Sequence, residues 1–416
     1  MNKRKLVFVS GIANAFEWYD YALFGLFAPI IGAKFFPGSS PSSSLLHAFL
    51  AFAIGYLMRP IGGVFFGILG DRFGRKTALS ASMFCMSLPT ALIGMLPTYD
   101  DIGITATILM ILVRMLQGLS MGGVLTGSIS FVIEHTGVAY RGFSGSVSMS
   151  SICIGLLFGS GISQCIQSFL SVDQFNDWGW RIPFLLGIFI LFAGLYIRKY
   201  TSETPSFQSM KENGGILKSP LKKVISVYWF DMIISIFINS TGSVLFYLQT
   251  IYLMSFLRIN RGFSNDEVTN LANYCYIIMI IATLCSGYLS DIIGRKKIFV
   301  INLLVIILVT PFLMNVIETW DFYFIITSQI ILSILAASYI GPEPALQAEF
   351  YPTNIRNTAL SLSYNIATSI FGGTTPLVIE YLVQKTGTIT SSIYYIIACA
   401  ISSLIALYFY KDRSRI

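Results

Sequence analysis

The chain has 416 residues, of which 55% are hydrophobic and 11% are charged, and its net charge is +7. A soluble domain is about 45–50% apolar and about 25% charged, so this composition argues against a soluble protein and indicates a membrane protein. The basic residues form short clusters between apolar runs, a pattern that suits loops beside an anionic membrane surface and argues against nucleic-acid binding.

The apolar segments are numerous enough for twelve membrane-spanning helices. A helix that crosses a bilayer needs about 20 predominantly apolar residues. Segments of this kind lie at 6–32, 45–70, 78–97, 103–133, 142–168, 179–198, 224–255, 268–290, 298–317, 321–347, 358–384 and 390–410. The first follows the basic letters "NKRK", but it carries Glu17 and Asp20 and has no obvious cleavage site. We therefore expect a retained span and not a signal peptide.

A polar stretch divides these segments into two sets of six. We predict an N-terminal bundle over 1–198, a linker over 199–223 and a C-terminal bundle over 224–416. The predicted fold class is an all-α membrane protein with twelve transmembrane helices in two six-helix repeats. Most of the 27 Lys and Arg residues fall at the two ends of the chain, in the linker and in alternate loops. The positive-inside rule then predicts that both termini and the linker are cytoplasmic.

Two charged loops repeat each other across the halves. The sequences "GDRFGRKT" (70–77) and "SDIIGRKK" (290–297) share Asp, Gly, Arg and Lys at the same spacing. The sequences "EHTGVAYRGFSGS" (134–146) and "EFYPTNIRNTALS" (349–361) align at nearly the same offset. This duplication indicates a transporter built from two parallel repeats.

The aspartate of each repeated loop is predicted to form a latch on the cytoplasmic side. The alternative is that the basic residues only enforce topology, but topology alone would not require the aspartate. A small residue one turn earlier, such as Gly67, would let helices approach closely. The ion pairs that we consider are Asp71 with Arg75 or Arg141, and Asp291 with Arg295 or Arg356.

Three charged residues fall near the middle of predicted spans, where ionisable groups are expensive and usually mark function. At 1.5 Å per residue, Glu17 lies roughly 16 Å from the cytoplasmic end of the first span. Arg59 lies roughly 18 Å from Asp71 in the second span, and Arg114 lies roughly 16 Å below the outer end of the fourth. The similar depths predict a shared polar cavity.

Glu17 and Asp20 are three residues apart, so they share a helix face with Tyr21 and Phe24. We interpret this face as a proton and substrate site, with Glu17 as the first candidate for proton coupling and Asp20 as the second. The alternative is a static buried network in which Arg59 neutralises the two carboxylates.

The second half offers further candidates within its spans. Asp231 is either another proton-coupling group or a boundary residue, because it lies close to a predicted helix end. Glu343 stands between Pro342 and Pro344, which should break the helix where backbone lines a cavity, or else Glu343 faces cytoplasmic water. Asn365 is a candidate for lining the substrate cavity.

The sequence contains few motifs that would indicate an enzyme. It has two distant histidines and no Cys-x-x-Cys pair, so we predict no metal site and no cofactor. The loop at 70–77 has three residues between its glycines, whereas a phosphate-binding loop needs four. An intramembrane enzyme would need a nucleophile–base pair or a metal cluster, and we consider it a remote alternative.

The repeated loop resembles the signature loop of the major facilitator superfamily. The resemblance is greatest to its metabolite–proton symporter branch and spans nearly the whole chain. The supporting stretches are "EWYDY" (17–21), "RPIGGVFFGILGDRFGRK" (59–76), "RMLQGLSMGG" (114–123), "WGWRIPF" (178–184) and "YPTNIRNTALSLSYN" (351–365). Two departures stand out: Val124 replaces the Glu that usually follows "GG" in the branch, and no charged coiled coil follows the last span, so osmotic sensing through such a tail is not expected.

The resemblance implies a proton-coupled importer in the bacterial inner membrane, with a small molecule and protons as its partners. Within the branch the sequence looks most like proline and glycine betaine symporters, although citrate and 2-oxoglutarate carriers share much of the pattern. Intramembrane acids outnumber arginines, which favours a zwitterion over a dicarboxylate. A betaine-like cation would be held by a carboxylate and by the rings of Trp18, Tyr21 and Phe24. Its carboxylate end would bind Arg59 or Arg114.

Overall fold

The computed structural model describes residues 3–38 and 41–411, and every regular element in these ranges is a helix. The first half contains α1 (Lys3–Phe35), α2 (Pro41–Phe73), α3 (Arg75–Met95), α4 (Tyr99–Ile102), α5 (Ile104–His135), η1 (Val138–Tyr140), α6 (Arg141–Phe169), α7 (Val172–Gln174), η2 (Phe175–Gly179), α8 (Arg181–Leu186) and α9 (Phe189–Tyr200). Two short helices follow, α10 (Pro205–Glu212) and α11 (Pro220–Val227).

The second half is interrupted more often. It contains α12 (Trp229–Tyr247), η3 (Leu248–Tyr252), α13 (Leu253–Asn260), α14 (Asn265–Ile293), α15 (Arg295–Thr319), α16 (Phe322–Ile340), α17 (Glu343–Phe350), α18 (Arg356–Ala367), η4 (Thr368–Gly372), α19 (Thr375–Thr386), η5 (Ile389–Ser391) and α20 (Ser392–Phe409). The expected break at the paired prolines is present, because α16 ends at Ile340 and α17 begins at Glu343. The expected start of a span at residue 224 is wrong, because that residue lies in α11 and the long helix begins at Trp229.

The helices have the length and composition of membrane spans. Eleven of them, within the part of the chain that the structure describes, are long and apolar enough to cross a bilayer, and they correspond to predicted spans two to twelve. The first predicted span corresponds to α1, which has 33 residues. Large apolar side chains such as Leu57 and Leu308 point outward, which suits contact with lipid.

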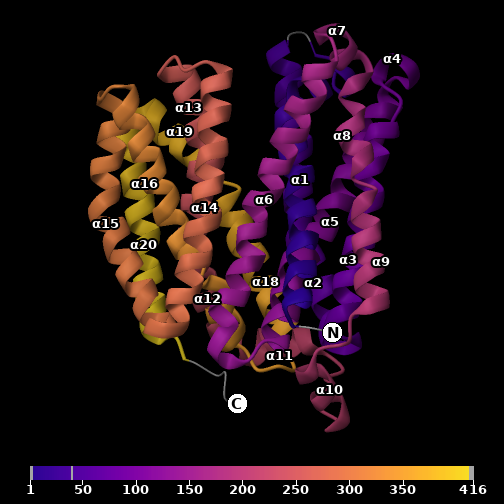
Figure 1. Cartoon of the computed structure of the whole chain (residues 1–416), viewed down its shortest axis with the longest axis vertical. Helices are drawn as coiled ribbons and strands as arrows, with labels where there is room; N and C mark the ends of the chain where they lie inside the picture. The colour runs from indigo at the N-terminus through magenta and orange to yellow at the C-terminus, as the bar shows by residue number, and fades with distance from the viewer. Residues whose placement is uncertain (1–2, 39–40, 412–416) are drawn as a thin grey trace.

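The helices are arranged in two groups that follow the order of the chain. In Figure 1 the indigo-to-magenta helices lie on one side and the orange-to-yellow helices lie on the other. Helices α6 and α14 pack against each other across the groups, and so do α2 and α18. Both ends of the chain lie at the same end of the molecule as α10 and α11 (Figure 1). The exact limits of the two bundles and the linker stay a prediction.

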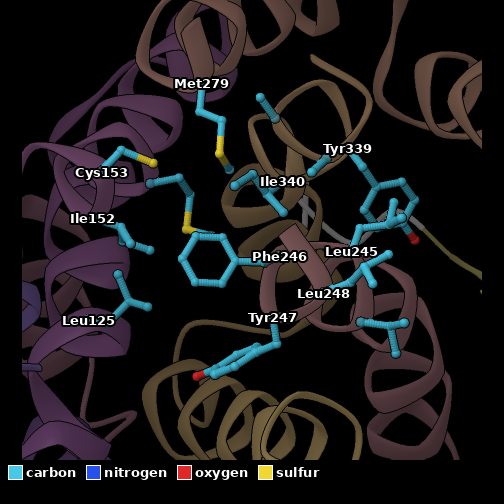
Figure 2. Close-up of a cluster of buried hydrophobic side chains, with 14 of the residues drawn as sticks. Leu125, Ile152, Cys153, Leu245, Phe246, Tyr247, Leu248, Met279, Tyr339 and Ile340 are labelled. Carbon is cyan, nitrogen blue, oxygen red and sulfur yellow. The ribbon is translucent and has the colours of Figure 1, made fainter. Parts of the chain in front are cut away.

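A buried apolar cluster joins the two groups. It contains Leu125, Ile152 and Cys153 from the first half together with Phe246 and Met279 from the second. Figure 2 shows the Phe246 ring directed from its helix toward Ile152 and Cys153. The polar residues described below lie beside this cluster.

The glycine of each repeated loop makes a sharp turn between two long helices. Gly74 and Gly294 have φ values of 107° and 101°, in a region that side chains rarely tolerate. Each directly precedes the arginine that starts the next helix, Arg75 in α3 or Arg295 in α15. The turn therefore accounts for the repeated glycine and sets the direction of the arginine after it.

Candidate functional site

The first buried ion pair joins α1 to α2. An oxygen of the Glu17 carboxylate lies 3.8 Å from Nη2 of Arg59, and both side chains are almost completely buried. The Arg59 guanidinium lies over the ring of Tyr56, with 5.2 Å between its central carbon and the ring centroid. Its Nε donates to Oδ1 of Asn365 at 3.4 Å. The structure thus brings three predicted site residues together, Glu17, Arg59 and Asn365.

The second buried ion pair joins α1 to α5. Oδ2 of Asp20 lies 3.6 Å from Nη1 of Arg114 and accepts a hydrogen bond from Gln117 at 2.9 Å. This pair lines a narrow cavity together with Tyr21. Asp20 and Glu17 therefore pair with different arginines, so the alternative in which Arg59 neutralises the two carboxylates is wrong for Asp20.

The two ion pairs keep unused hydrogen-bonding capacity. Both carboxylate oxygens of Glu17 and both terminal nitrogens of Arg59 lack a hydrogen-bond partner among the described residues, and so do Nε and Nη2 of Arg114. Buried charges are costly unless they are paired and well hydrogen-bonded. Such loosely satisfied groups can bind a proton on the acid and a ligand carboxylate on the arginine.

The predicted aromatic residues of α1 separate into two places. The Phe24 ring lies 3.5 Å from the central carbon of the Arg114 guanidinium. The Trp18 ring instead contacts Tyr21, with ring centroids 5.0 Å apart, and Phe246 of α12, with centroids 5.3 Å apart. Trp18 therefore reaches the interface between the halves, whereas Phe24 packs on an arginine within the first half.

Sequence reasoning missed the aromatic partners from the second half. Trp18 lines a narrow internal cavity with Phe246, Tyr247 and Tyr364. The hydroxyl groups of Tyr56 and Tyr247 form a hydrogen bond that joins the halves. Aromatic residues are too common in membrane helices for Phe246, Tyr247 and Tyr364 to stand out in the sequence, and only packing identifies them.

Asp231 lies apart from these pairs. It is buried in the first turn of α12, and its backbone carbonyl accepts from the hydroxyl of Tyr351 at 3.4 Å. Gly242, which lines the cavity with Trp18, is eleven residues further along the helix, or about 16 Å at 1.5 Å per residue. The position favours a boundary residue, and a role for Asp231 in proton coupling stays a prediction.

The repeated aspartates bind the N-terminal turns of helices in the opposite half. Asp71 lies 3.2 Å from Nη2 of Arg75 and accepts from the backbone N–H groups of Asn357 at 3.1 Å and Thr358 at 2.8 Å. These N–H groups belong to the first turn of α18, where the helix dipole also favours a negative charge. The predicted pair of Asp71 and Arg75 is therefore present, and the aspartate also holds the two halves together.

The aspartate of the second repeat binds a helix N-terminus of the first half. Asp291 lies 2.6 Å from Nη2 of Arg295 and accepts from the backbone N–H groups of Gly142 at 2.9 Å and Phe143 at 2.8 Å. These residues form the first turn of α6. The two aspartates therefore make equivalent contacts across the interface.

Two of the predicted ion-pair alternatives are wrong. Arg141 pairs with Glu349 at 3.8 Å and not with Asp71, and Arg356 pairs with Glu134 at 3.1 Å and not with Asp291. The physical reason is that the loop aspartates are occupied by helix N-termini, so each arginine contacts the glutamate of the opposite half.

Glu134 and Glu349 are the residues of this end that the sequence did not assign. Glu134 also binds Arg75 at 3.1 Å and accepts from the Thr204 hydroxyl at 2.6 Å. Glu349 also lies 3.4 Å from Nε of Arg295. Their matching positions in the two repeats were a usable signal, because each glutamate precedes the arginine of its own half, Arg141 or Arg356, by seven residues.

The predicted close approach at Gly67 is also present. A Cβ atom at this position would lie 2.8 Å from Cα of Thr358, which is closer than real Cβ contacts. Gly67 therefore lets α2 pack directly on α18. Together with the aspartates, it keeps the two halves in contact, and so closed, at the end of the molecule where the chain termini lie.

These features define a class of protein before any comparison. Long apolar helices in two repeated sets, ion pairs buried within them and duplicated contacts between the sets at one end are the features of a membrane transporter. The protein is an integral membrane protein.

Comparison with known proteins assigns the family. The family described as "Sugar (and other) transporter" matches residues 6–223, and the family described as "Major Facilitator Superfamily" matches residues 250–415. The chain belongs to the major facilitator superfamily. The expected fold class, the resemblance to this superfamily and the expectation of a transporter and not an enzyme are confirmed.

Relatives match along almost the whole chain. A putative proline/betaine transporter of Staphylococcus haemolyticus is 36% identical, with 97% of this chain and 86% of the relative covered. The proline/betaine transporter of Escherichia coli K12 is 31% identical, with 97% and 82% covered. Among solved structures, the proton:xylose symporter XylE superposes with a TM-score of 0.83 at 16% identity, covering 99% of this chain and 96% of XylE. The human organic anion transporter MFSD10 superposes with a TM-score of 0.71 at 13% identity, covering 98% and 100%.

Proposed function

We propose that this protein is a proton-coupled symporter that imports a small zwitterionic osmolyte such as proline or glycine betaine. The observation that carries the proposal is the identity of 31–36% over nearly the whole chain to relatives named as proline/betaine transporters. We place the protein in the bacterial inner membrane, with both termini and residues 199–223 in the cytoplasm.

The buried pair of Glu17 and Arg59 supports coupling between a proton and a substrate carboxylate. A proton on Glu17 removes the negative charge that faces Arg59 at 3.8 Å. The guanidinium is then free to pair with a carboxylate from the substrate, because it is costly to leave a buried charge unpaired. Proton and substrate therefore favour each other's binding, a reciprocal coupling that supports symport. Asp20 with Arg114 offers a second pair of the same kind.

The contacts between the halves, at the end of the molecule where the chain termini lie, would control the conformational change of the transport cycle. In the conformation described here, Asp71 and Asp291 hold the first turns of α18 and α6. We propose that bundles 1–198 and 224–416 rock against each other, and that release into the cytoplasm requires these contacts to break.

The proposal is tested by uptake in proteoliposomes. Purified protein should take up labelled glycine betaine or proline when the outside is more acidic than the lumen. Unlabelled glycine betaine and proline should compete better than 2-oxoglutarate, because the buried acids Glu17, Asp20 and Glu343 outnumber Arg59 and Arg114. Stronger competition by 2-oxoglutarate or citrate would transfer the function to a carboxylate carrier.

A further inference from the structure

The cavity that Trp18 lines also contains an unusual carboxylate. Glu343 is 3% exposed and contributes to the lining together with Asn239, Phe246 and Tyr364. Helix α16 ends at Ile340 and α17 begins at Glu343, so the Glu343 side chain lies at the break between the two helices. A Cβ atom at Gly242 would lie 3.2 Å from Oε2 of Glu343, so the glycine leaves space for the carboxylate beside α12.

Glu343 differs from the other intramembrane acids in its lack of an arginine. Glu17 faces Arg59 and Asp20 faces Arg114, but no ion pair joins Glu343 to a basic side chain in the described ranges. Its Oε1 has no hydrogen-bond partner there. A buried carboxylate without a cation is costly, so Glu343 either takes up a proton or pairs with a positive group from outside the protein.

The amide of Asn239 supports the same conclusion. Its Oδ1 accepts from the Ser243 hydroxyl at 2.7 Å, but its Nδ2 has no hydrogen-bond partner among the residues described. The Asn239 side chain interacts with the Glu343 carboxylate beside the cavity, but neither Nδ2 of Asn239 nor Oε1 of Glu343 makes a hydrogen bond of normal geometry among the residues described. Buried polar groups are nearly always satisfied by protein, water or ligand, so this pair points to a ligand site.

Aromatic rings surround the same space. Trp18 and Phe246 come from opposite halves and meet edge to face with centroids 5.3 Å apart. Tyr364 completes the aromatic lining from α18. Aromatic faces attract ammonium groups, and a quaternary ammonium depends on them because it has no N–H to donate.

We propose that this cavity is the subsite for the onium group of the substrate, with Glu343 as its counter-ion and with Trp18, Phe246 and Tyr364 as its aromatic wall. The inference rests on the proposed function and assigns a different residue from the acids of α1 to the cationic end. Tyr247 lines the cavity and forms a hydrogen bond with Tyr56, and the guanidinium of Arg59 lies over the Tyr56 ring. These contacts connect the cavity to Arg59, which would receive the carboxylate end of a zwitterion held at Glu343.

This assignment gives different roles to two acids, Glu17 and Glu343. Glu17 already has Arg59 as its counter-ion, so a proton on Glu17 releases Arg59 for the substrate carboxylate. Glu343 faces no arginine, so a cationic group of the substrate is the partner that its carboxylate lacks within the described residues. Because Trp18 and Phe246 belong to different halves, the onium group also bridges the two bundles.

A test on the unmodified protein uses a carbon isostere. In 3,3-dimethylbutanoate the trimethylammonium group of glycine betaine is replaced by a tert-butyl group, so the shape is retained and the positive charge is lost. Glycine betaine should inhibit betaine exchange in proteoliposomes on the order of 100-fold better than the isostere, from one ion pair and the aromatic contacts. Equal inhibition by the two compounds would overturn the subsite.

The variant test uses Glu343→Gln with Glu380→Gln as its matched control. Glu380 is exposed in the middle of α19 and accepts from the Tyr252 hydroxyl at 3.0 Å. Glu343→Gln should reduce the preference for betaine over the isostere to less than about threefold, while Glu380→Gln keeps the wild-type preference. Retention of the wild-type preference by Glu343→Gln would contradict the inference.

A second variant tests the aromatic wall. Phe246→Leu should weaken inhibition by betaine more than inhibition by proline, because proline has N–H donors and depends less on aromatic faces. Equal weakening would contradict a role for the aromatic wall.

Two other outcomes distinguish failure of the subsite from failure of the proposed function. If Glu343→Gln loses only accumulation driven by a pH gradient and keeps both exchange and the preference, Glu343 binds the proton and the subsite is wrong. If wild-type protein exchanges neither betaine nor proline, the proposed function itself fails.

Discussion

At the scale of single residues, the chain places two acids on one helix and gives each its own arginine. Glu17 and Asp20 are separated by three residues of α1, yet one meets Arg59 of α2 and the other meets Arg114 of α5. Neither distance is short enough for a hydrogen bond, so the pairs are electrostatic contacts that a proton or a ligand can replace. This property distinguishes them from the tightly bonded acids at the closed end.

Glu17→Gln tests the proton-coupling role. Glutamine keeps the shape of the side chain and cannot change its charge, so uptake should no longer respond to a pH gradient. Exchange of substrate across the membrane should continue, because exchange needs no net proton movement. Labelled betaine uptake and counterflow in proteoliposomes measure the two activities. Gradient-driven accumulation at the wild-type level would remove Glu17 from the mechanism.

Asp71→Asn tests the latch. The neutral amide weakens the bonds to Arg75 and to the N–H groups of Asn357 and Thr358. Loss of one charge-assisted bond, at about 1.5–3 kcal/mol, shifts the conformational equilibrium about 10- to 100-fold toward the open state.

The readout for Asp71→Asn is the alkylation rate of a cysteine at Ser361, which lies buried against Thr126 across the interface. Asp291→Asn should have the same effect as Asp71→Asn, because the two aspartates make equivalent contacts. Asp100→Asn in the exposed helix α4 is the control. An unchanged alkylation rate in both interface variants would mean that the aspartates do not control the opening.

At the scale of helices, the contact between α2 and α18 depends on the absence of a side chain at Gly67. A valine there would collide with the backbone of Thr358, because even its Cβ would lie 2.8 Å from Cα. Overpacking of this kind typically costs about 1–3 kcal/mol, and here the cost falls only on the closed state. Gly67→Val should therefore increase alkylation at position 361.

The matched control for Gly67→Val is Gly161→Val, because Gly161 is also helical but has nothing within 4 Å of a Cβ. Both variants carry the same loss of glycine, so they differ only in the contact across the interface. Equal alkylation in the two variants would show that the contact between α2 and α18 does not determine the conformation.

The helices also show which features a sequence can predict. The spans follow from apolar length alone, and the break before Glu343 follows from Pro342 and Pro344. The π-helical turns at η3 and η4 were not predicted, because no proline lies within either segment. The pairing of Glu17 with Arg59 was predictable from their depth along two helices. The pairing of Arg141 with Glu349 was not, because it depends on how the two halves meet.

At the scale of the whole molecule, the halves are similar in construction and different in chemistry. Both close one end with an aspartate on a helix N-terminus, but the two pairs near the middle of the spans, Glu17 with Arg59 and Asp20 with Arg114, lie in the first half. The second half contributes aromatic rings, Asn239 and Glu343 to the interface. The substrate site that we propose is therefore complete only when both halves are present.

The orientation in the membrane is tested by reporter fusions. Fusions after Lys218 and after Lys385 should report opposite compartments, with Lys218 in the cytoplasm, because most basic residues lie on that side. An enzyme that is active only in the cytoplasm and one that is active only outside it provide the two readouts. Matching signals at the two positions would contradict the topology.

The most direct test of proton-coupled import is to record proton movement and substrate movement together. Proteoliposomes with a pH-sensitive dye in the lumen and no imposed gradient receive glycine betaine or proline from outside. Our proposal predicts that the lumen acidifies as labelled substrate enters, and that Glu17→Gln exchanges substrate without acidification. Entry of substrate into wild-type vesicles with no change in lumenal pH would contradict it.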